Sequence, residues 1–298
     1  PTEQPSLITD TYVSNSNDSY WLSNPDNPLE GFSPIIGNEQ LTRSLRTRAG
    51  LKFVEEVLNS DQKFNQSMVQ NLLFNHRHYG AEIFLDDILT VCVQSEDLQE
   101  ACEILAQWDR RQDLDSVGAV IFNRFWSIAG TVSDHYLVPF DVNNPIHTPS
   151  GLKIEEAVTQ EFITASLQEA VASLNEAEIP LDAKWGDVQF VLRNEDKIGI
   201  PGGSGRQGMF SVITSRFDAD RGGYNPISHG NSYIQAVTWN DDGTPNAKAI
   251  LTYSQSPEPD SAFYSDMTKL YSQSEWSDLP FTDEQITAQL IREENLRY

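Results

Sequence analysis

The sequence changes character at Pro180, and this change sets the class of fold. Before it lie long segments whose apolar residues recur every three or four positions, the spacing of one helix face. After it come short runs rich in β-branched and aromatic residues, divided by Gly, Asn and Pro, which is typical of antiparallel strands. Because helices and strands are segregated along the chain, we predict an α+β fold.

The same pattern divides the 298 residues into four parts. These are 1–36, a strand and a loop; 37–180, a helical block; 181–259, antiparallel strands; and 260–298, a helical tail. In the block, helices are expected near 38–59, 65–76, 81–93, 97–108, 117–130 and 151–176. Residues 10–17 alternate like a strand, which we expect to join the later sheet. In the tail, Thr282 and Gln285 have the spacing of a capping box.

The balance of charge limits the partners of the chain. Lys and Arg total 20, and Asp and Glu total 44, so the formal net charge is −24. Nucleic acid and anionic membrane surfaces both attract positive faces, so we expect neither as a partner. No apolar stretch reaches the roughly 18 residues of a membrane span. The chain opens PTEQPSLITD without an initiator Met or a signal peptide, so we expect it to be cut from something longer or cloned as a fragment.

The two cysteines, Cys92 and Cys102, have two interpretations. On one continuous helix they would lie too far apart to bond. If the QSED segment between them breaks the helix, two antiparallel helices would bring them together, and a disulfide would imply an oxidising compartment. Otherwise they are two small buried side chains.

Several local patterns suggest chemistry, but their surroundings argue against each. Gly203–Gly208 fits G-x-G-x-x-G, yet strand-like residues follow it where a dinucleotide site needs a helix, so we expect a glycine-rich hairpin loop. Ser204 misses the last glycine of the nucleophile elbow G-x-S-x-G, and no helix is expected after it. The segment from Asp218 begins like a calcium loop but lacks the later EF-hand ligands. His76 and His78 have no third metal ligand nearby, so we expect a surface or helix-end pair.

A cluster of small polar residues, NSNDS at 15–19, follows the first predicted strand. Such side chains weaken a sheet unless they hydrogen-bond. One interpretation is a turn after an edge strand. The other is a set of side-chain amide donors suited to an oxyanion hole.

At this segment the chain resembles the penicillin acylase family, and within it the acyl-homoserine-lactone and aculeacin-type acylases. The matching stretches run nearly from end to end. They are VSNSNDSYWLSNPDNPLEGFSPIIGNE, RSLRTRAGL, IPGGSGRQGMFSVI, HGNSYIQAVTW and AKAILTYSQSPEPDSAFYSDMTKLYSQSEWSDLPFTDEQI. The middle helices match more loosely, chiefly around CEILAQWD.

This resemblance implies a secreted or periplasmic zymogen that cleaves itself into a small and a large subunit, with an αββα sandwich fold. The large subunit of such N-terminal-nucleophile hydrolases begins with Ser, which attacks an amide and forms an acyl-enzyme. Pro1 is not that Ser. The chain would therefore be the C-terminal part, 1–298, of a large subunit with a large helical insertion, active only with the Ser-bearing segment and small subunit as partners.

The resemblance also carries site residues onto this sequence. The oxyanion-hole Asn falls on Asn17, with Asn15 as the alternative register. A site-lining Arg falls on Arg43, Arg46 or Arg48. No cofactor is required, although a structural Ca²⁺ is compatible with the family, with a weak match to a ligand at Asp26.

The implied substrates are small acylated amines. N-acyl-homoserine lactones come first, and quorum quenching would follow from their hydrolysis; cyclic lipopeptides and β-lactams stay open. Because the nucleophile lies outside the chain, a second hypothesis is a non-catalytic, secreted, acidic binding or scaffold module with an acylase-like fold.

Overall fold

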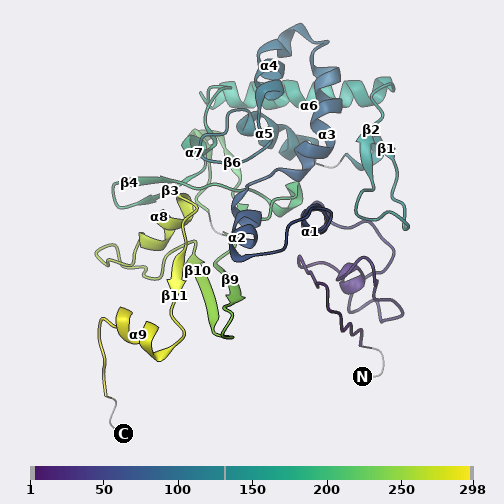
Figure 1. The fold of residues 1–298 in the computed structure, drawn as a ribbon. Coiled ribbons are helices and arrows are strands. Elements are labelled where there is room, and N and C mark those ends of the chain that lie inside the picture. Colours follow the sequence, from purple (N-terminus) through teal and green to yellow (C-terminus); the bar gives the residue numbers. More distant parts are fainter. Residues whose placement is uncertain (1–3, 131, 228, 296–298) are drawn as a thin grey trace.

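The computed structural model describes residues 4–130, 132–227 and 229–295 (Figure 1). Helices and small antiparallel sheets are mixed in it, which confirms the α+β class. The helices are α1 (Leu45–Leu58), α2 (Gln66–Phe74), α3 (Tyr79–Cys92), α4 (Gln99–Gln107), α5 (Ala119–Ala129), α6 (Ala157–Glu176), α7 (Trp185–Val188), α8 (Asp266–Ser272) and α9 (Asp283–Gln289).

The six helices expected before Pro180 are all present, but α1 and α6 begin seven and six residues later than predicted. Helix α1 begins at Leu45 instead of near residue 38, because Gln40 has a φ of +55° and the Ser44 side chain caps the helix by accepting the Thr47 N–H. Helix α6 begins at Ala157, since residues 150–152 form a strand instead.

The strands form small antiparallel sheets. They are β1 (Tyr136–Val138), β2 (Ser150–Leu152), β3 (Phe190–Arg193), β4 (Asp196–Gly199), β5 (Ile213–Thr214), β6 (Phe217–Asp218), β7 (Gly223–Tyr224), β8 (His229–Gly230), β9 (Tyr233–Trp239), β10 (Pro245–Leu251) and β11 (Ser277–Leu279). The one three-stranded sheet in the described ranges has the order β11–β10–β9, and the others pair two strands each. Strand β11 lies in the tail that was expected to be helical throughout.

The predicted strand at 10–17 is wrong: the described residues before α1 contain one 3₁₀ turn, Tyr20–Leu22, and no strand. A strand needs a neighbour for its N–H and C=O groups. Over this stretch the only backbone pairing among described residues joins the Ser14 N–H to the Ser23 carbonyl at 2.8 Å. The segment therefore runs as an extended loop along the outside of the molecule (Figure 1).

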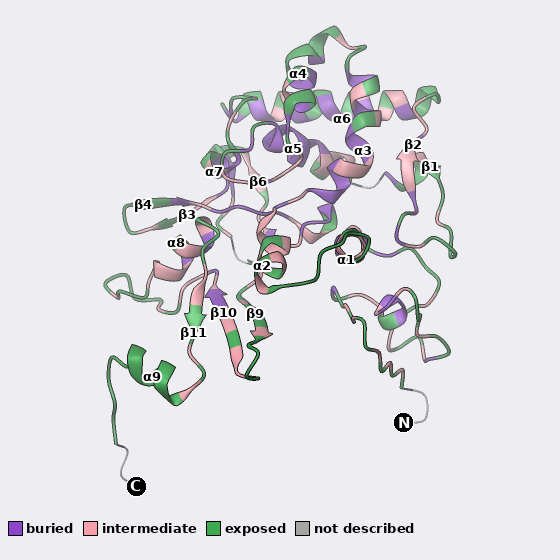
Figure 2. Cartoon of the chain, in the orientation of Figure 1, coloured by how far each residue is buried: buried purple, intermediate pink, exposed green. Residues whose placement is uncertain are grey.

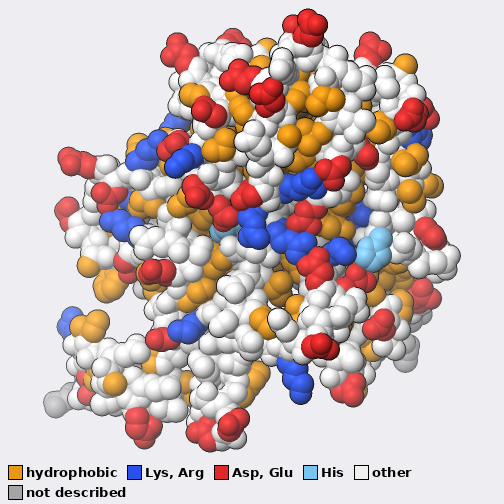
Figure 3. Space-filling view, turned by 45° about the horizontal axis from the view of Figure 1, so that its top comes forward, with side chains coloured by type: hydrophobic (Ala, Val, Ile, Leu, Met, Phe, Trp, Pro, Cys, Tyr) orange, Lys and Arg blue, Asp and Glu red, His pale blue; other side chains and the backbone are white. Residues whose placement is uncertain are grey.

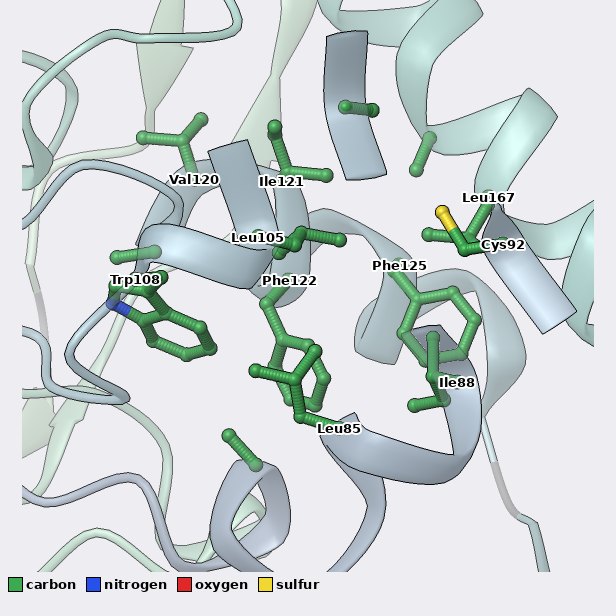
Figure 4. Close-up of a cluster of buried hydrophobic side chains, with 14 of the residues drawn as sticks. Leu85, Ile88, Cys92, Leu105, Trp108, Val120, Ile121, Phe122, Phe125 and Leu167 are labelled. Carbon is green, nitrogen blue, oxygen red and sulfur yellow. The ribbon is translucent and has the colours of Figure 1, made fainter. Parts of the chain in front are cut away.

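The main core lies between α3, α4, α5 and α6 (Figure 2). Leu85, Ile88, Phe122 and Phe125 are fully buried there and meet Leu105 of α4 (Figure 4). Burying each such side chain contributes roughly 1.5–3 kcal/mol. This helical core carries α5, one wall of the cleft described below.

A disulfide bond joins Cys92 and Cys102, whose Cα atoms are 5.9 Å apart. The break between α3 and α4 brings the two cysteines together, as the second of the two interpretations required. Both are buried at the edge of the helical core, so the bond fixes the turn between the two helices.

The tail leaves the body of the molecule, and α9 is exposed along its length (Figures 1 and 2). The predicted capping box is confirmed, because the Thr282 hydroxyl accepts the Gln285 N–H and the Gln285 side chain accepts the Thr282 N–H. In the part of the chain that is described, no helix is both long and apolar enough to cross a membrane.

Candidate functional site

A cleft of about 1290 Å³ opens between the N-terminal loop, α5 and the strand-rich half. Segments far apart in the sequence line it. They include Ser16–Asp18 of the loop, Arg124 and Trp126 of α5, Gly203–Gln207 and Val212–Phe217. Three residues of the NSNDS cluster, for which an oxyanion role is predicted, therefore line the cleft.

Asn17 and Asn15, the two predicted oxyanion donors, have different surroundings. The Asn15 side chain closes its own turn, since Oδ1 accepts the Asn17 N–H at 2.8 Å and Nδ2 donates to the Asp18 carbonyl at 3.2 Å. Asn17 lines the cleft, whereas Asn15 does not. Asn17 also has a φ of +58°, a left-handed conformation that Asn tolerates better than most residues.

The contact between Arg46 and Asn17 orients the Asn17 amide. Arg46 Nη2 donates to Asn17 Oδ1 at 2.9 Å and to the Ser16 carbonyl at 2.5 Å. Because a guanidinium only donates, it must face the amide oxygen and not the NH₂ group. Asn17 Nδ2 donates to no other residue that the structure describes. Two N–H bonds are thus free on a side chain whose oxygen is anchored.

Asp18 ties the NSNDS loop to the start of α1. Its carboxylate accepts the N–H groups of Ser19 at 2.8 Å and Ser44 at 3.1 Å, the Thr47 hydroxyl at 2.8 Å, and Arg43 Nη1 at 2.9 Å. Burial alone would raise the pKa of this carboxyl. The hydrogen bonds, led by the one from Ser44, outweigh burial and lower the pKa of Asp18 from its usual value.

Of the three predicted arginines, only Arg46 lines the cleft. Arg43 is buried and forms an ion pair with Asp18. Arg48 is also buried, and its Nε donates to the Ile146 carbonyl at 2.8 Å. Arg43 therefore holds the Asp18 loop near the start of α1, and Arg48 binds the Ile146 loop to α1.

The glycine-rich segment forms a loop, but not the expected hairpin, because Gly203 and Val212 on its two sides form a parallel bridge. The next element after the loop is strand β5 and not a helix. Residues Gly205–Gln207 make one 3₁₀ turn, which is capped by the Ser204 hydroxyl and the Gln207 side chain. A Cβ at Gly203 would lie 1.8 Å from Oε1 of the buried Gln112, so a larger residue there would require the Gln112 side chain to move. The loop packs tightly and walls the cleft.

His76 and His78 are both buried, so the expected surface location is wrong, although His78 does lie at a helix end. His78 Nδ1 accepts the Ala81 N–H at 3.0 Å at the start of α3, and His76 Nδ1 lies 2.8 Å from Ser211 Oγ. Burial lowers the pKa of each to about 3, so both are neutral near pH 7.

Asp26, the predicted calcium ligand, lies exposed in a turn where its N–H is bonded to Asn24 Oδ1 at 2.9 Å. Over the described ranges, no three His, Cys, Asp or Glu residues form a group that could hold a metal ion. A calcium ion at Asp26 stays a prediction.

A buried polar network beside the cleft was missed from the sequence. The Tyr224 hydroxyl donates to Asn123 Oδ1 at 2.7 Å, and Asn123 Nδ2 donates to Gln207 Oε1 at 3.3 Å. Burial raises the pKa of Tyr224, so its hydroxyl stays protonated and can donate. Since 101 residues separate Asn123 from Tyr224, no local spacing could have linked them.

Comparison with known proteins supports the resemblance over the whole chain. The penicillin amidase family model matches residues 1–288. The acyl-homoserine lactone acylase PvdQ of Pseudomonas syringae pv. syringae (strain B728a) is 35% identical over 291 residues, covering 96% of this chain and 37% of that protein. Aculeacin-A acylase of Actinoplanes utahensis is 36% identical over 303 residues, covering 97% of this chain and 37% of that protein.

The chain thus spans little more than a third of the length of these curated relatives. The family match nonetheless extends over nearly all of it, including the loop that carries Asn17 and the glycine-rich wall of the cleft. On this match, the chain belongs to the penicillin amidase family.

Proposed function

We propose that the chain is the C-terminal part of the large subunit of an N-acyl amidohydrolase. It supplies one donor of the oxyanion hole, and the Ser nucleophile comes from a segment outside it. The observation that carries this proposal is the Asn17 amide, which lines the cleft with its oxygen anchored by Arg46 and its N–H groups free. The acylase names of the relatives support the reaction class.

In this mechanism, the hydroxyl of an N-terminal Ser attacks the substrate amide, and its own α-amino group takes the proton. Negative charge develops on the carbonyl oxygen. Asn17 Nδ2–H donates to that oxygen and stabilises it, and fixing the Asn17 side chain beforehand avoids the cost of reorienting it during the reaction. The α-amino group then passes the proton to the nitrogen of the substrate amide, and the amine leaves. Water hydrolyses the acyl-enzyme, which releases the acid and restores the Ser hydroxyl.

The remaining segments would complete the αββα sandwich. One face of the β11–β10–β9 sheet supports this, because Val237 is paired with Ala247 and Ala247 with Leu279, so their side chains share that face. Val237 is 39% exposed, Leu279 41% and the neighbouring Trp239 68%. An uncovered apolar sheet face of this kind is typical of an interface, here with the second layer of the sandwich.

The proposed substrates are N-acyl-homoserine lactones or related acylated amines, by analogy with the activities named in the relatives. Quorum quenching would follow from their hydrolysis. The proposed location is periplasmic or secreted, which the Cys92–Cys102 disulfide supports, since such bonds persist in oxidising compartments.

The proposal is tested by Asn17→Ala in the complete enzyme, which includes the Ser-bearing segment. We expect kcat for amide hydrolysis to fall about 10²–10³-fold, with a smaller change in KM, because the lost donor acts mainly in the transition state. Asn15→Ala is the matched control and should cost much less, since Asn15 only closes the turn. Unchanged hydrolysis in Asn17→Ala would show that this assignment is wrong.

A further inference from the structure

The cleft concentrates positive charge in a strongly acidic chain. Of the 20 Lys and Arg residues four line it, while of the 44 Asp and Glu residues only Asp18 is found there among those described. The four are Arg46, Arg124, Arg206 and Arg216. The charge of Asp18 is already balanced by Arg43, 2.9 Å away. Elsewhere carboxylates spread over the surface, as one face of the molecule shows (Figure 3).

Two of these arginines have structural partners. Arg46 holds Asn17 and the Ser16 carbonyl. Arg124 Nε donates to Ser173 Oγ at 2.8 Å, and its guanidinium lies 4.4 Å from the centre of the Phe217 ring. Their charges contribute to the positive potential of the cleft, but some of their N–H groups already donate to protein atoms.

Arg206 and Arg216 are exposed, and their guanidinium groups have no hydrogen bond or ion pair with any residue in the described ranges. Arg206 lies on the 3₁₀ turn that packs against Arg46, since a Cβ on Gly205 would be 3.3 Å from Arg46 Cδ. Arg216 directly precedes Phe217, which Arg124 covers. Two guanidinium groups on the lining of the cleft thus have no partner among the described residues.

We propose that the substrate of this cleft carries a carboxylate, which Arg206 and Arg216 bind, so that the complete enzyme prefers N-acyl amino acids to uncharged acyl amides. This inference rests on the proposed function. Guanidinium groups match carboxylate geometry and bind it with charge-assisted hydrogen bonds. This chain carries a net charge of −24, so the arginines of the cleft form a local positive site to which an anion can bind.

Carboxylates of the segments outside this chain could bind Arg206 and Arg216 in place of a substrate carboxylate. In that case the two arginines would hold the assembled enzyme together and would not distinguish one substrate from another. A matched pair of substrates separates the two possibilities, because a preference between substrates is measured within one protein and does not depend on how much of it is folded.

The experiment compares N-decanoyl-homoserine lactone with its ring-opened acid, N-decanoyl-homoserine, at near-neutral pH in the complete enzyme. The acyl chains are identical, and opening the neutral lactone ring with water produces a carboxylate and a hydroxyl group. We expect kcat/KM to be about tenfold higher for the acid, and the preference to shrink with added NaCl. Arg206→Gln and Arg216→Gln should each reduce the ratio severalfold. Arg221→Gln, an exposed arginine that does not line the cleft, is the control and should leave the ratio unchanged.

A ratio near one, or a preference for the lactone, that neither variant changes would overturn the inference and leave the proposed function intact. Equal losses on both substrates with a lower melting temperature would assign the arginines to subunit contacts, which also overturns it. Failure of the unmodified complete enzyme to hydrolyse either amide would reject the proposed function together with the inference.

Discussion

The hydrogen bond from Arg46 determines which end of the Asn17 amide can bind a substrate. Arg46 bonds both the side-chain oxygen of Asn17 and the backbone carbonyl of Ser16, so the loop and the amide are positioned by one guanidinium. Lys at this position would offer a point charge without the planar set of donors. Arg46 is therefore a positioning residue in this account.

We predict that Arg46→Met lowers kcat for amide hydrolysis by about tenfold, less than the loss for Asn17→Ala, because the donor remains but loses its anchor. KM should change less than kcat, and this split distinguishes lost positioning from lost substrate binding. Arg221→Met provides a control away from the cleft. An unchanged kcat in Arg46→Met would contradict the positioning role.

Asp18 makes the stability of the same loop depend on pH. Its pKa is lower in the folded protein, so its contribution to stability is present above the unfolded pKa of about 3.9 and is lost as the pH falls through the folded pKa. We predict that Asp18→Asn costs about 1–2 kcal/mol at pH 7 and much less at pH 3. Urea unfolding midpoints of both proteins at the two pH values measure this, and a difference that does not shrink with acid would refute it.

At the scale of helices and strands, the sequence predicts best the features that depend on neighbouring residues. The apolar spacing of the six helices before Pro180 and the Thr282 capping box depend on neighbouring residues, and both are present. The strand at 10–17 fails because pairing requires a partner strand, which alternation alone does not supply. The late start of α1 depends on the Ser44 cap, which the apolar spacing alone does not reveal.

The site was only partly predictable for a related reason. The NSNDS cluster is contiguous and was found, yet its two asparagines could be separated only by a contact with Arg46, 29 residues away. Spacing along α1 likewise could not show that Arg46 faces the cleft while Arg43 and Arg48 do not. Arg206 and Arg216 were missed because the cleft gathers them from separate loops.

The disulfide between α3 and α4 provides a test at this scale. It closes a loop of ten residues, for which the chain-entropy relation gives a stabilisation of about 3 kcal/mol. We predict that the Cys92→Ala/Cys102→Ala protein melts at a lower temperature than the unmodified protein under oxidising conditions. Reductant present during unfolding should lower the melting temperature of the unmodified protein only. Equal melting temperatures in both would contradict a stabilising bond.

For the whole molecule, the features of the site and those of the surface both favour the proposed function. The Asn17 side chain is anchored in an open cleft, and an apolar face of the β11–β10–β9 sheet is exposed. The family relatives are more than twice as long as this chain. One proposal explains these observations: further segments complete both the sandwich and the catalytic centre.

Denaturing intact mass spectrometry with N-terminal sequencing, applied to every polypeptide in material purified from the native source, tests this account most directly. The account predicts a polypeptide that begins with Ser and either contains this sequence or copurifies with it, and amide hydrolysis by that material. A folded chain of this sequence alone, with no Ser-initiated polypeptide and no amide hydrolysis, would contradict it and favour the non-catalytic binding module.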